Sequence, residues 1–243
     1  MQPWVLTFRA ETTKLRRRTM LLPCLYAILD AACFPQADIM FAAAEELAGA
    51  GVTLLQYRNK SGNARRMLEE ARELKRLVGS RVRLIMNDRA DLCVAADFDG
   101  LHLGQDDLSP GAARMIIGDS PSAAKAASSG GPLAARVERR TRCLGVSTHN
   151  PEQLAVADKT SADYLAIGPV FGTSSKENPD PVVGLEGVRR ARELTRKPLV
   201  AIGGITRANA RSVIEAGADA VAVISDLIRE PRKSAEEFLR VLG

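Results

Sequence analysis

Short apolar runs rich in β-branched residues alternate with stretches of helical periodicity from residue 25 onward. Eight of these runs predict strands, at residues 25–29, 53–56, 83–86, 100–103, 143–146, 164–167, 199–202 and 220–224. Helical spacing predicts helices at residues 39–48, 64–78, 91–96, 111–117, 151–157, 185–194, 208–216 and 234–241. The pattern therefore predicts a succession of strand–helix units.

Regular alternation of strands and helices favours parallel pairing, because each helix returns the chain to the same edge of the sheet. Several strands are apolar at nearly every position, as expected when both faces of a sheet are covered. Eight repeats in 243 residues, 46% of them hydrophobic, suit a closed barrel of roughly 250 residues better than an open sheet. The predicted fold class is α/β, a single (βα)8 TIM barrel over residues 21–243.

Two segments do not follow this pattern. Residues 1–20 hold five lysines and arginines against one glutamate, which predicts a disordered basic extension. Its arginines and the apolar run behind them also resemble a signal or transit peptide, but Asp30 ends that run and a strand overlaps it. In residues 122–135, twelve of fourteen are Ala, Ser, Gly or Pro, which predicts a mobile, low-complexity insertion at about 119–141 between strands four and five. An Ala-rich partial helix is the alternative.

Composition argues against several classes of partner. The net charge is +5, but the basic extension accounts for +4, so the barrel gives no reason to expect a nucleic-acid partner. Aromatic residues make up 4%, too few for a base-stacking surface, and no apolar run is long enough for a membrane span. The four cysteines match no zinc pattern, and we interpret them as reduced thiols of a cytoplasmic protein.

Acidic clusters follow two neighbouring strands. Asn87 and Asp88 follow the third strand, and Gln105, Asp106 and Asp107 follow the fourth. The C-terminal ends of parallel strands meet at one rim, where two carboxylates can hold one hard cation. Oxygen ligands without a cysteine or histidine cluster favour Mg²⁺ over zinc. Either aspartate alone would be ordinary turn or helix-cap chemistry, but together they predict a magnesium site.

The same rim gathers groups suited to phosphates. Gln56, Arg58 and Lys60 end the second strand, and the two cations can contact a diphosphate, although such cations are usually plain surface residues. The glycines at 203–204 and the residues at 224–225 follow strands seven and eight, the common phosphate position of barrels. A tight turn is the alternative for the glycine pair.

The remaining polar residues of the rim are less specific. Thr173, Ser175 and Lys176 lie in a loop beyond strand six, which is either a lid over substrate phosphates or a hydroxyl-rich loop without a task. His102 lies within a strand and is expected to pack. His149 has no orienting partner in the sequence, so we give it little weight as a base.

These motifs resemble those of the thiamine-phosphate synthase family, also called thiamine-phosphate pyrophosphorylases. The resemblance runs from about residue 25 to 228 and rests on LYAILD, GVTLLQYRNK, MNDRADL, DGLHLGQDDL, LGVSTHN, DYLAIGPVFGTSSK, IGGI and ADAVAVIS. It implies a magnesium-assisted transferase that joins 4-amino-2-methyl-5-hydroxymethylpyrimidine diphosphate to a thiazole phosphate by a dissociative mechanism, giving thiamine phosphate and diphosphate. Its expected partners are these small molecules, with no nucleic acid and no membrane, in a cytoplasmic protein for which a homo-oligomer is allowed.

The resemblance also implies a role for each motif. Asp88 and Asp107 would ligate Mg²⁺. The pyrimidine diphosphate would be held by Gln56, Arg58, Lys60, Asn87, Ser147 and Lys176, of which Arg58, Lys60 and Lys176 are the expected catalytic residues. The thiazole phosphate would be held by Thr173, Ser175, Gly204, Ile224 and Ser225.

One segment departs from the family pattern. The usual QLREK-type sequence reads QYRNK here, with Tyr57 for an aliphatic residue and Asn59 for a glutamate. We therefore expect Arg58 and Lys60 to be less neutralised than in the family. Two other functions stay open: a thiazole tautomerase-like barrel, which needs no diphosphate site, and a non-catalytic binding protein for thiamine precursors. The sequence also leaves open whether the thiazole carries a carboxyl group.

Overall fold

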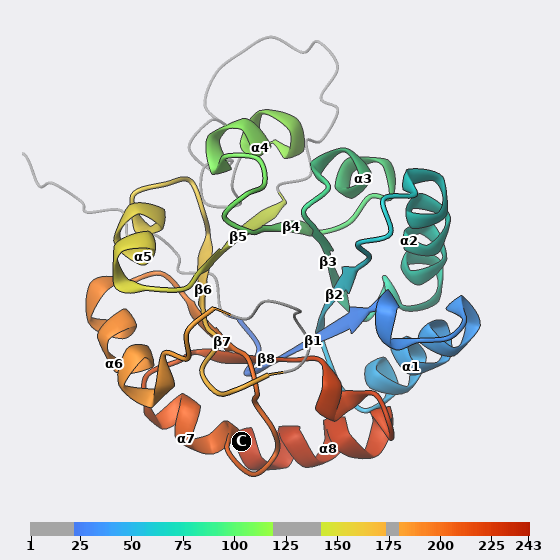
Figure 1. Ribbon diagram of the computed structural model, residues 1–243. Helices are drawn as coiled ribbons and strands as arrows, with labels where there is room; N and C mark the ends of the chain where they lie inside the picture. Colours follow the sequence, from blue (N-terminus) through green and yellow to red (C-terminus); the bar gives the residue numbers. More distant parts are fainter. Residues whose placement is uncertain (1–21, 119–141, 174–179) are drawn as a thin grey trace, which may run out of the picture.

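The computed structural model describes residues 22–118, 142–173 and 180–243. In these residues, eight parallel strands pair in sequential order and close into one barrel, and a ring of helices surrounds it (Figure 1). The strands are β1 (Leu25–Asp30), β2 (Leu54–Arg58), β3 (Arg83–Asn87), β4 (Gly100–Leu103), β5 (Cys143–Thr148), β6 (Tyr164–Ile167), β7 (Leu199–Ile202) and β8 (Ala220–Val223). The predicted (βα)8 TIM barrel is confirmed.

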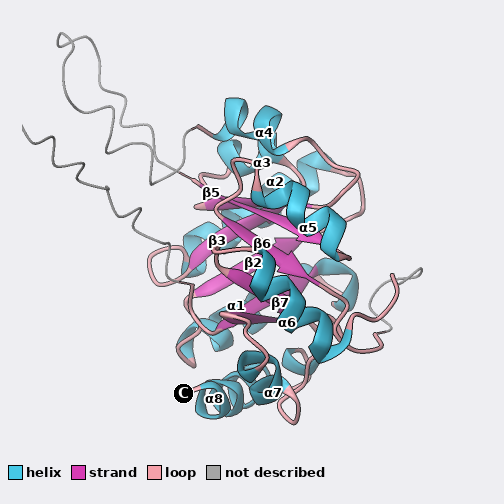
Figure 2. Cartoon of the chain, turned by 90° about the vertical axis from the view of Figure 1, so that its left-hand side faces the viewer, coloured by secondary structure: helices cyan, strands magenta, loops and turns pink. Residues whose placement is uncertain are grey.

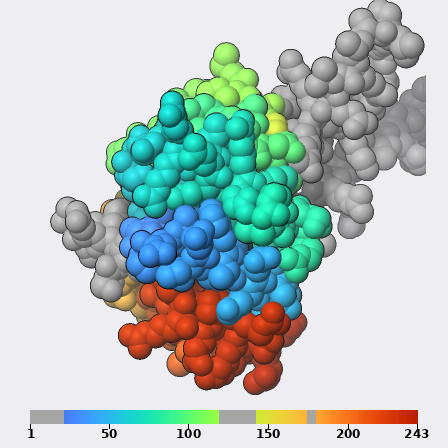
Figure 3. All heavy atoms as spheres, turned by 90° about the vertical axis from the view of Figure 1, so that its right-hand side faces the viewer, coloured from blue at the N-terminus to red at the C-terminus, as the bar shows by residue number. Residues whose placement is uncertain are grey.

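Each strand is followed by an α-helix that packs on the outside of the barrel. The helices are α1 (Ala37–Gly49), α2 (Ala64–Val78), α3 (Ala90–Ala95), α4 (Pro110–Ile117), α5 (Pro151–Asp158), α6 (Gly184–Leu194), α7 (Ala210–Glu215) and α8 (Pro231–Leu242). The strands run through the middle of the molecule (Figure 2), and the ring closes where α8 packs beside α1, which also contacts α2 (Figure 3).

The predicted elements differ from the observed ones mainly at their ends. β1, β2 and β3 each continue past the predicted end, because Asp30, Arg58 and Asn87 still pair with the neighbouring strand despite their polar side chains. Ile224, predicted to end strand eight, instead precedes a 3-10 helix, η2 (Ser225–Leu227). A second unpredicted 3-10 helix, η1 (Ala31–Cys33), follows β1. α8 starts earlier than predicted because Pro231 occupies its first turn, where the missing N–H leaves no hydrogen bond unmade.

Apolar side chains form two layers. The larger one fills the space between strands and helices, and α2 contributes Met67, Ala71, Leu74 and Val78 at the spacing of one helix face. The smaller layer fills the barrel interior with Tyr26, Ile28, Leu54, Ile85, Cys143, Tyr164, Ala166, Val200, Ala220 and Ala222. The interior is therefore a packed floor, and the residues at the strand ends stand above it.

Three aspartates stabilise the N-terminal rim of the barrel, opposite the strand ends predicted to carry the site. Each precedes an even-numbered strand and accepts a backbone N–H near the start of the strand before it: Asp99 from Leu84 at 2.9 Å, Asp163 from Leu144 at 2.9 Å, and Asp219 from Leu199 at 2.7 Å. Each also pairs with a helix cation, respectively Lys75, Arg114 and Arg192. The repeat ties strands and helices together in pairs around this rim.

The predicted basic extension (residues 1–20) and the predicted insertion (residues 119–141) lie outside the described residues. Among the helices that the structure describes, none has the length and apolar character needed to cross a membrane. All four cysteines are free thiols: Cys93 and Cys143 are buried, Cys24 is partly buried and Cys33 is exposed.

Candidate active site

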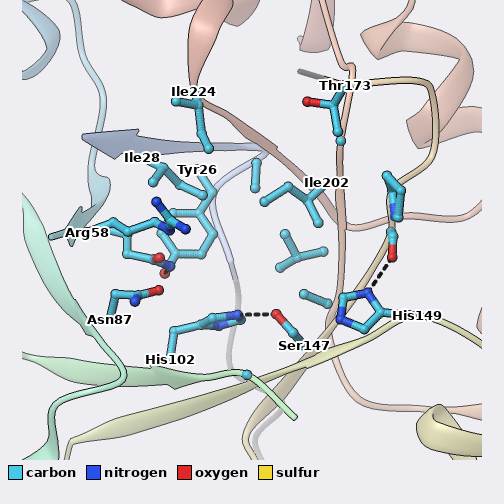
Figure 4. A pocket seen from close by; sticks show the side chains of 18 of the residues that line it. Tyr26, Ile28, Arg58, Asn87, His102, Ser147, His149, Thr173, Ile202 and Ile224 are labelled. Carbon is cyan, nitrogen blue, oxygen red and sulfur yellow. Dashed lines mark hydrogen bonds between the residues drawn. The ribbon is translucent and has the colours of Figure 1, made fainter. Parts of the chain in front are cut away.

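A pocket of about 560 Å³ opens at the C-terminal ends of the strands. Its wall is made by side chains from the ends of the strands and from the loops behind them, several of which are drawn in Figure 4. This is the face on which (βα)8 barrels carry their active sites.

The structure brings the predicted site residues together in this pocket. Its lining includes Gln56, Arg58, Lys60, Asn87, Asp88, Asp107, Ser147, Thr173, Gly204, Ile224 and Ser225. Ser175 and Lys176 lie outside the described residues. The geometry therefore agrees with the predicted location of the site, while the role of each residue stays a prediction.

Two carboxylates meet at the end of β3 and in the loop after β4. The side chains of Asp88 and Asp107 adjoin each other. Burial, and then the adjoining Asp88, raise the pKa of Asp107 above its ordinary value. Asp107 also accepts the Gly104 N–H at 2.7 Å, and Lys60 forms an ion pair with Asp88. Two anionic groups thus share one small volume that a cation can enter.

The backbone at Asp88 is held in an uncommon conformation. Its φ is +59°, in the left-handed region that non-glycine residues seldom occupy, although aspartate tolerates it better than most. The Asp88 N–H donates to the His102 carbonyl oxygen at 2.8 Å, which fixes this turn to the neighbouring strand. Strained residues of this kind cluster at functional sites, and here the strain places the carboxylate at the pocket.

Arg58 has a carboxylate partner that the sequence analysis missed. Asp30 ends β1 and lies directly opposite Arg58 in the ladder, and the two side chains form an ion pair. The Asp30 side chain is only 5% exposed, whereas Arg58 reaches the pocket. The available signal was the position of Asp30 at the end of the first strand, at the same rim as the other polar residues.

Asn59 and Tyr57 contact a helix carboxylate rather than the rim cations, and the expectation that Arg58 and Lys60 are less neutralised than in the family stays a prediction. Both side chains bind Glu70 of α2: Tyr57 Oη donates to its carboxylate at 2.5 Å and Asn59 Nδ2 at 2.9 Å. The helix therefore supplies a buried carboxylate beside Asn59. Arg58 and Lys60 keep carboxylate partners of their own, Asp30 and Asp88 respectively.

Buried polar side chains form a connected floor beneath the rim. Gln56, Tyr26, Tyr164, His102 and Ser147 are linked in that order by hydrogen bonds of 2.8, 3.0, 3.0 and 2.8 Å. Figure 4 shows the last of these bonds at the bottom of the pocket. The expectation that His102 packs is confirmed, since its ring stacks on Tyr164, but it also lines the pocket. Burial lowers the pKa of His102 to about 4, so the imidazole is neutral near pH 7.

His149 also has an orienting partner that the sequence did not reveal. Its Nδ1 lies 2.7 Å from the Gly168 carbonyl oxygen and 3.5 Å from an Asp180 carboxylate oxygen. Its backbone N–H donates to Gln153 Oε1 at 2.7 Å. Figure 4 shows the free edge of the ring turned toward the pocket interior, so His149 belongs to the lining rather than to the surface.

One buried polar atom of the lining has no protein partner. The side-chain nitrogen Nδ2 of Asn87 is fully buried, but it makes no hydrogen bond within the described part of the chain. An unsatisfied buried amide is costly in an apolar setting, and it is typical of a position that a ligand or an ordered water completes. Asn87 lies beside Arg58 in Figure 4, on the wall that carries the cations.

The opposite wall provides backbone and hydroxyl groups. Gly203 and Gly204 have φ of +101° and +63°, and a Cβ on Gly204 would come within 2.5 Å of the Gly172 carbonyl oxygen. Glycine is therefore required there, and it keeps the backbone accessible to a ligand. Figure 4 places Thr173 and Ile224 on this side, across the pocket from Asn87 and His102. The arrangement suits a second anionic group.

Comparison with known proteins identifies the family. The thiamine monophosphate synthase family model matches residues 25–123 and 130–227. A thiamine-phosphate synthase of Koribacter versatilis is 56% identical over 224 residues, covering 91% of this chain and 96% of the relative. One from Chloroflexus aurantiacus is 41% identical over 179 residues, covering 73% of each chain.

A solved structure agrees with these matches. A thiamine phosphate pyrophosphorylase from Pyrococcus furiosus superposes with a TM-score of 0.72 at 31% identity, covering 90% of this chain and 94% of the other. The residues matched by the family model include all eight strands of the barrel. The chain belongs to the thiamine monophosphate synthase family.

Proposed function

We propose that this protein condenses 4-amino-2-methyl-5-hydroxymethylpyrimidine diphosphate with a thiazole phosphate, giving thiamine phosphate and diphosphate. The observation that carries the proposal is that one pocket has two differently built walls, each with groups that can bind an anion. One wall has Arg58 and Lys60 beside an acidic pair, and the other has the glycine backbone at Gly204 and the start of η2. A substrate with a diphosphate and a substrate with one phosphate fit these two walls.

A magnesium ion fits the acidic pair. Asp88 and Asp107 supply hard oxygen ligands, and the raised pKa of Asp107 reflects a burial and repulsion that a divalent cation relieves. No cluster of three or more His, Cys, Asp or Glu side chains suited to a metal occurs in the residues described here. This agrees with Mg²⁺, which typically takes one or two carboxylates and completes its shell with water and substrate phosphates. When bound, the ion would neutralise charge on the departing diphosphate.

The chain's own residues would prepare the first bond to break. Arg58, fixed by Asp30, offers a fork of donors to the diphosphate, and Lys60 adds a point charge. These cations stabilise the charge that develops as the methylene–oxygen bond breaks and its electron pair leaves with the diphosphate. Asn87 Nδ2, which has no partner among the described residues, can donate to the same substrate. By resemblance Lys176 would join this set.

The second bond forms when the thiazole nitrogen donates its lone pair to the pyrimidine methylene cation. No protein nucleophile is required, so the task of the opposite wall is to hold the thiazole phosphate in register. Thr173, Gly204, Ile224 and Ser225 are the proposed contacts, with Ser175 added by resemblance. We further propose that the protein acts in the cytoplasm on these small molecules alone.

The test is an incubation of the purified protein with both substrates, with and without Mg²⁺, while thiamine phosphate and diphosphate are measured. We expect condensation that depends on Mg²⁺ and is lost in Arg58→Ala and Asp88→Asn. Arg76→Ala is the matched control, because Arg76 pairs with Glu73 on the exposed face of α2. Conversion of the thiazole alone would indicate a tautomerase, and binding of both substrates without product would indicate a binding protein. Either result would overturn the proposal.

A further inference from the structure

A continuous chain of hydrogen bonds joins two residues that the proposed function assigns to the pyrimidine. Gln56 and Ser147 lie on β2 and β5, on different sides of the barrel, and three side chains connect them. Tyr26 of β1 accepts from Gln56 Nε2, Tyr164 of β6 contacts Tyr26, and His102 of β4 spans from Tyr164 to Ser147. Each connecting residue comes from a different strand, so the chain crosses the barrel floor.

The hydrogen bonds of this chain can be satisfied in one consistent direction. Gln56 donates to the Tyr26 hydroxyl, which then has its own proton to give to Tyr164. Tyr164 in turn donates to Nδ1 of His102. When Nδ1 of a neutral imidazole accepts a hydrogen bond, the ring proton is on Nε2. His102 Nε2 lies 2.8 Å from Ser147 Oγ, so it donates to that oxygen.

The direction of the chain determines what the pocket presents to a ligand. Because Ser147 Oγ accepts from His102, its own proton is left to point into the pocket as a donor. At the other end, Gln56 uses its amide nitrogen toward Tyr26, so its carbonyl oxygen Oε1 is left as an acceptor. The two ends therefore offer opposite hydrogen-bonding characters, and the chain links one to the other.

The connecting residues are held firmly enough to perform this task. Tyr26 and Tyr164 are each 1% exposed, and their rings meet edge to face with centroids 6.1 Å apart. The His102 ring stacks on Tyr164 at 5.6 Å. Burial raises the pKa of both tyrosines and lowers that of His102, so all three stay uncharged near pH 7. Because these three side chains are buried, each of their hydrogen bonds is strengthened and orients the next.

We propose that Tyr26, Tyr164 and His102 are positioning residues for the condensation, acting through Ser147 and Gln56. They fix the Ser147 hydroxyl as a donor toward an acceptor atom of the pyrimidine diphosphate, and they keep the Gln56 carbonyl oxygen available as an acceptor. This inference rests on the proposed function, since it assumes that the pyrimidine occupies the side of the pocket above the chain.

Tyr164→Phe removes one link and keeps the ring. His102 Nδ1 then has no donor, so the imidazole is free to exchange its proton between the two nitrogens. In the Nδ1–H form, Nε2 becomes an acceptor and takes the Ser147 proton away from the pocket. We expect kcat/KM for the pyrimidine diphosphate to fall roughly tenfold, the usual effect of one hydrogen bond. The KM for the thiazole phosphate should stay the same.

A double-mutant cycle tests whether Tyr164 acts through Ser147. In a Ser147→Ala background the positioned hydroxyl is absent, so Tyr164→Phe should cause no further loss of kcat/KM. A merely structural role for Tyr164 would cause the same loss in both backgrounds and would overturn the proposal. Tyr57→Phe is the matched control, because Tyr57 is equally buried but faces Glu70 outside the barrel. A similar loss in Tyr57→Phe would also count against it.

The tautomer of His102 gives a readout that is independent of turnover. In ¹⁵N-histidine-labelled, tag-free protein at pH 8, we expect the Nε2–H form for His102, assigned by its loss in His102→Gln, and a mixture of forms in Tyr164→Phe. An Nδ1–H form in the parent protein would overturn the proposal even if condensation is observed. Absence of condensation together with the expected tautomer would instead refute the proposed function and leave the hydrogen-bond chain intact.

Discussion

Replacing Gly145 by alanine should destabilise the barrel, because Gly145 makes room for Tyr164. Gly145 lies on β5, and a Cβ built there would be 2.0 Å from Tyr164 Cζ and 2.4 Å from its hydroxyl oxygen. Ordinary carbon contacts are about 3.5–4.0 Å, so the ring would have to move by more than about 1 Å. Tyr164 is buried, stacked on His102 and hydrogen-bonded to it, so moving the ring would break these contacts.

The size of the effect follows from three contributions. Overpacking a core costs about 1–3 kcal/mol, and displacing the Tyr164 hydroxyl from His102 costs about 0.5–1.5 kcal/mol more. Replacing glycine within a strand returns up to about 1 kcal/mol, because alanine loses less backbone entropy on folding. Taking the middle of each range, we expect Gly145→Ala to lower the free energy of unfolding by about 2–3 kcal/mol. For a barrel of this size, the melting temperature should fall by about 4–12 °C.

Urea denaturation followed by circular dichroism measures this change. Gly111→Ala is the control, since Gly111 lies in α4 with no atom near its missing Cβ and should gain up to about 1 kcal/mol. In a Tyr164→Leu background the clash is absent, so Gly145→Ala should cost almost nothing. A loss below about 1 kcal/mol in the parent protein, or an equal loss in both backgrounds, would refute the steric argument.

Three other predictions concern the rim cations, the metal site and the buried thiols. Asp107→Asn should abolish the rise in melting temperature caused by Mg²⁺ while the metal-free variant stays folded, as a thermal-shift titration would show. Arg58→Lys should lower kcat/KM for the pyrimidine diphosphate by about 10²–10³-fold through loss of the forked contact, and Asp30→Asn should lower it less, since Arg58 remains. Burial raises the pKa of Cys93 and of Cys143 to about 12, above that of an unfolded thiol near 9. The thiols of the unfolded chain therefore lose their protons at lower pH than those of the folded protein. The free energy of unfolding should be highest below pH 9 and should decline toward pH 12, by at most about 1.4 kcal/mol per pH unit for each thiol. The slope should be shallower in Cys93→Ala.

A specific result would contradict each of these three predictions. A Mg²⁺-dependent thermal shift that survives in Asp107→Asn would move the metal site elsewhere. Equal activities of Arg58→Lys and the parent protein would show that a point charge is enough. An unfolding free energy that is the same at pH 8.5 and pH 10 would mean that the two thiols ionise with ordinary pKa values in the folded protein.

The location of the site was predictable because (βα)8 barrels carry their functional residues at one rim, at the C-terminal ends of the strands. Each strand was recognisable as an apolar run, so the polar residue that ended the run was assigned to that rim without knowledge of side-chain contacts. Asp88 and Asp107 are the clearest case, since the adjacency of two strands was enough to predict that they meet. The partner of Arg58 was missed because the pairing of Asp30 depends on the register between β1 and β2.

The floor of the pocket could not be predicted by the same reasoning. Tyr26 and Tyr57 both lie in apolar strands, yet Tyr26 faces the barrel axis and Tyr57 faces the helices. When both faces of a strand are apolar, the alternation that would separate inside from outside is absent from the sequence. Only the closed barrel shows that Tyr26, Tyr164 and His102 meet at its centre.

The aspartates at the opposite rim have a consequence for how this barrel can change. Asp99, Asp163 and Asp219 secure strand starts through backbone amides and helix cations, and none of them lines the pocket. These strand starts are thus secured by side chains other than those that line the pocket. Substitutions at the N-terminal rim can therefore change the thermal stability of the barrel, in evolution or in engineering, without changing the residues of the pocket at the C-terminal rim.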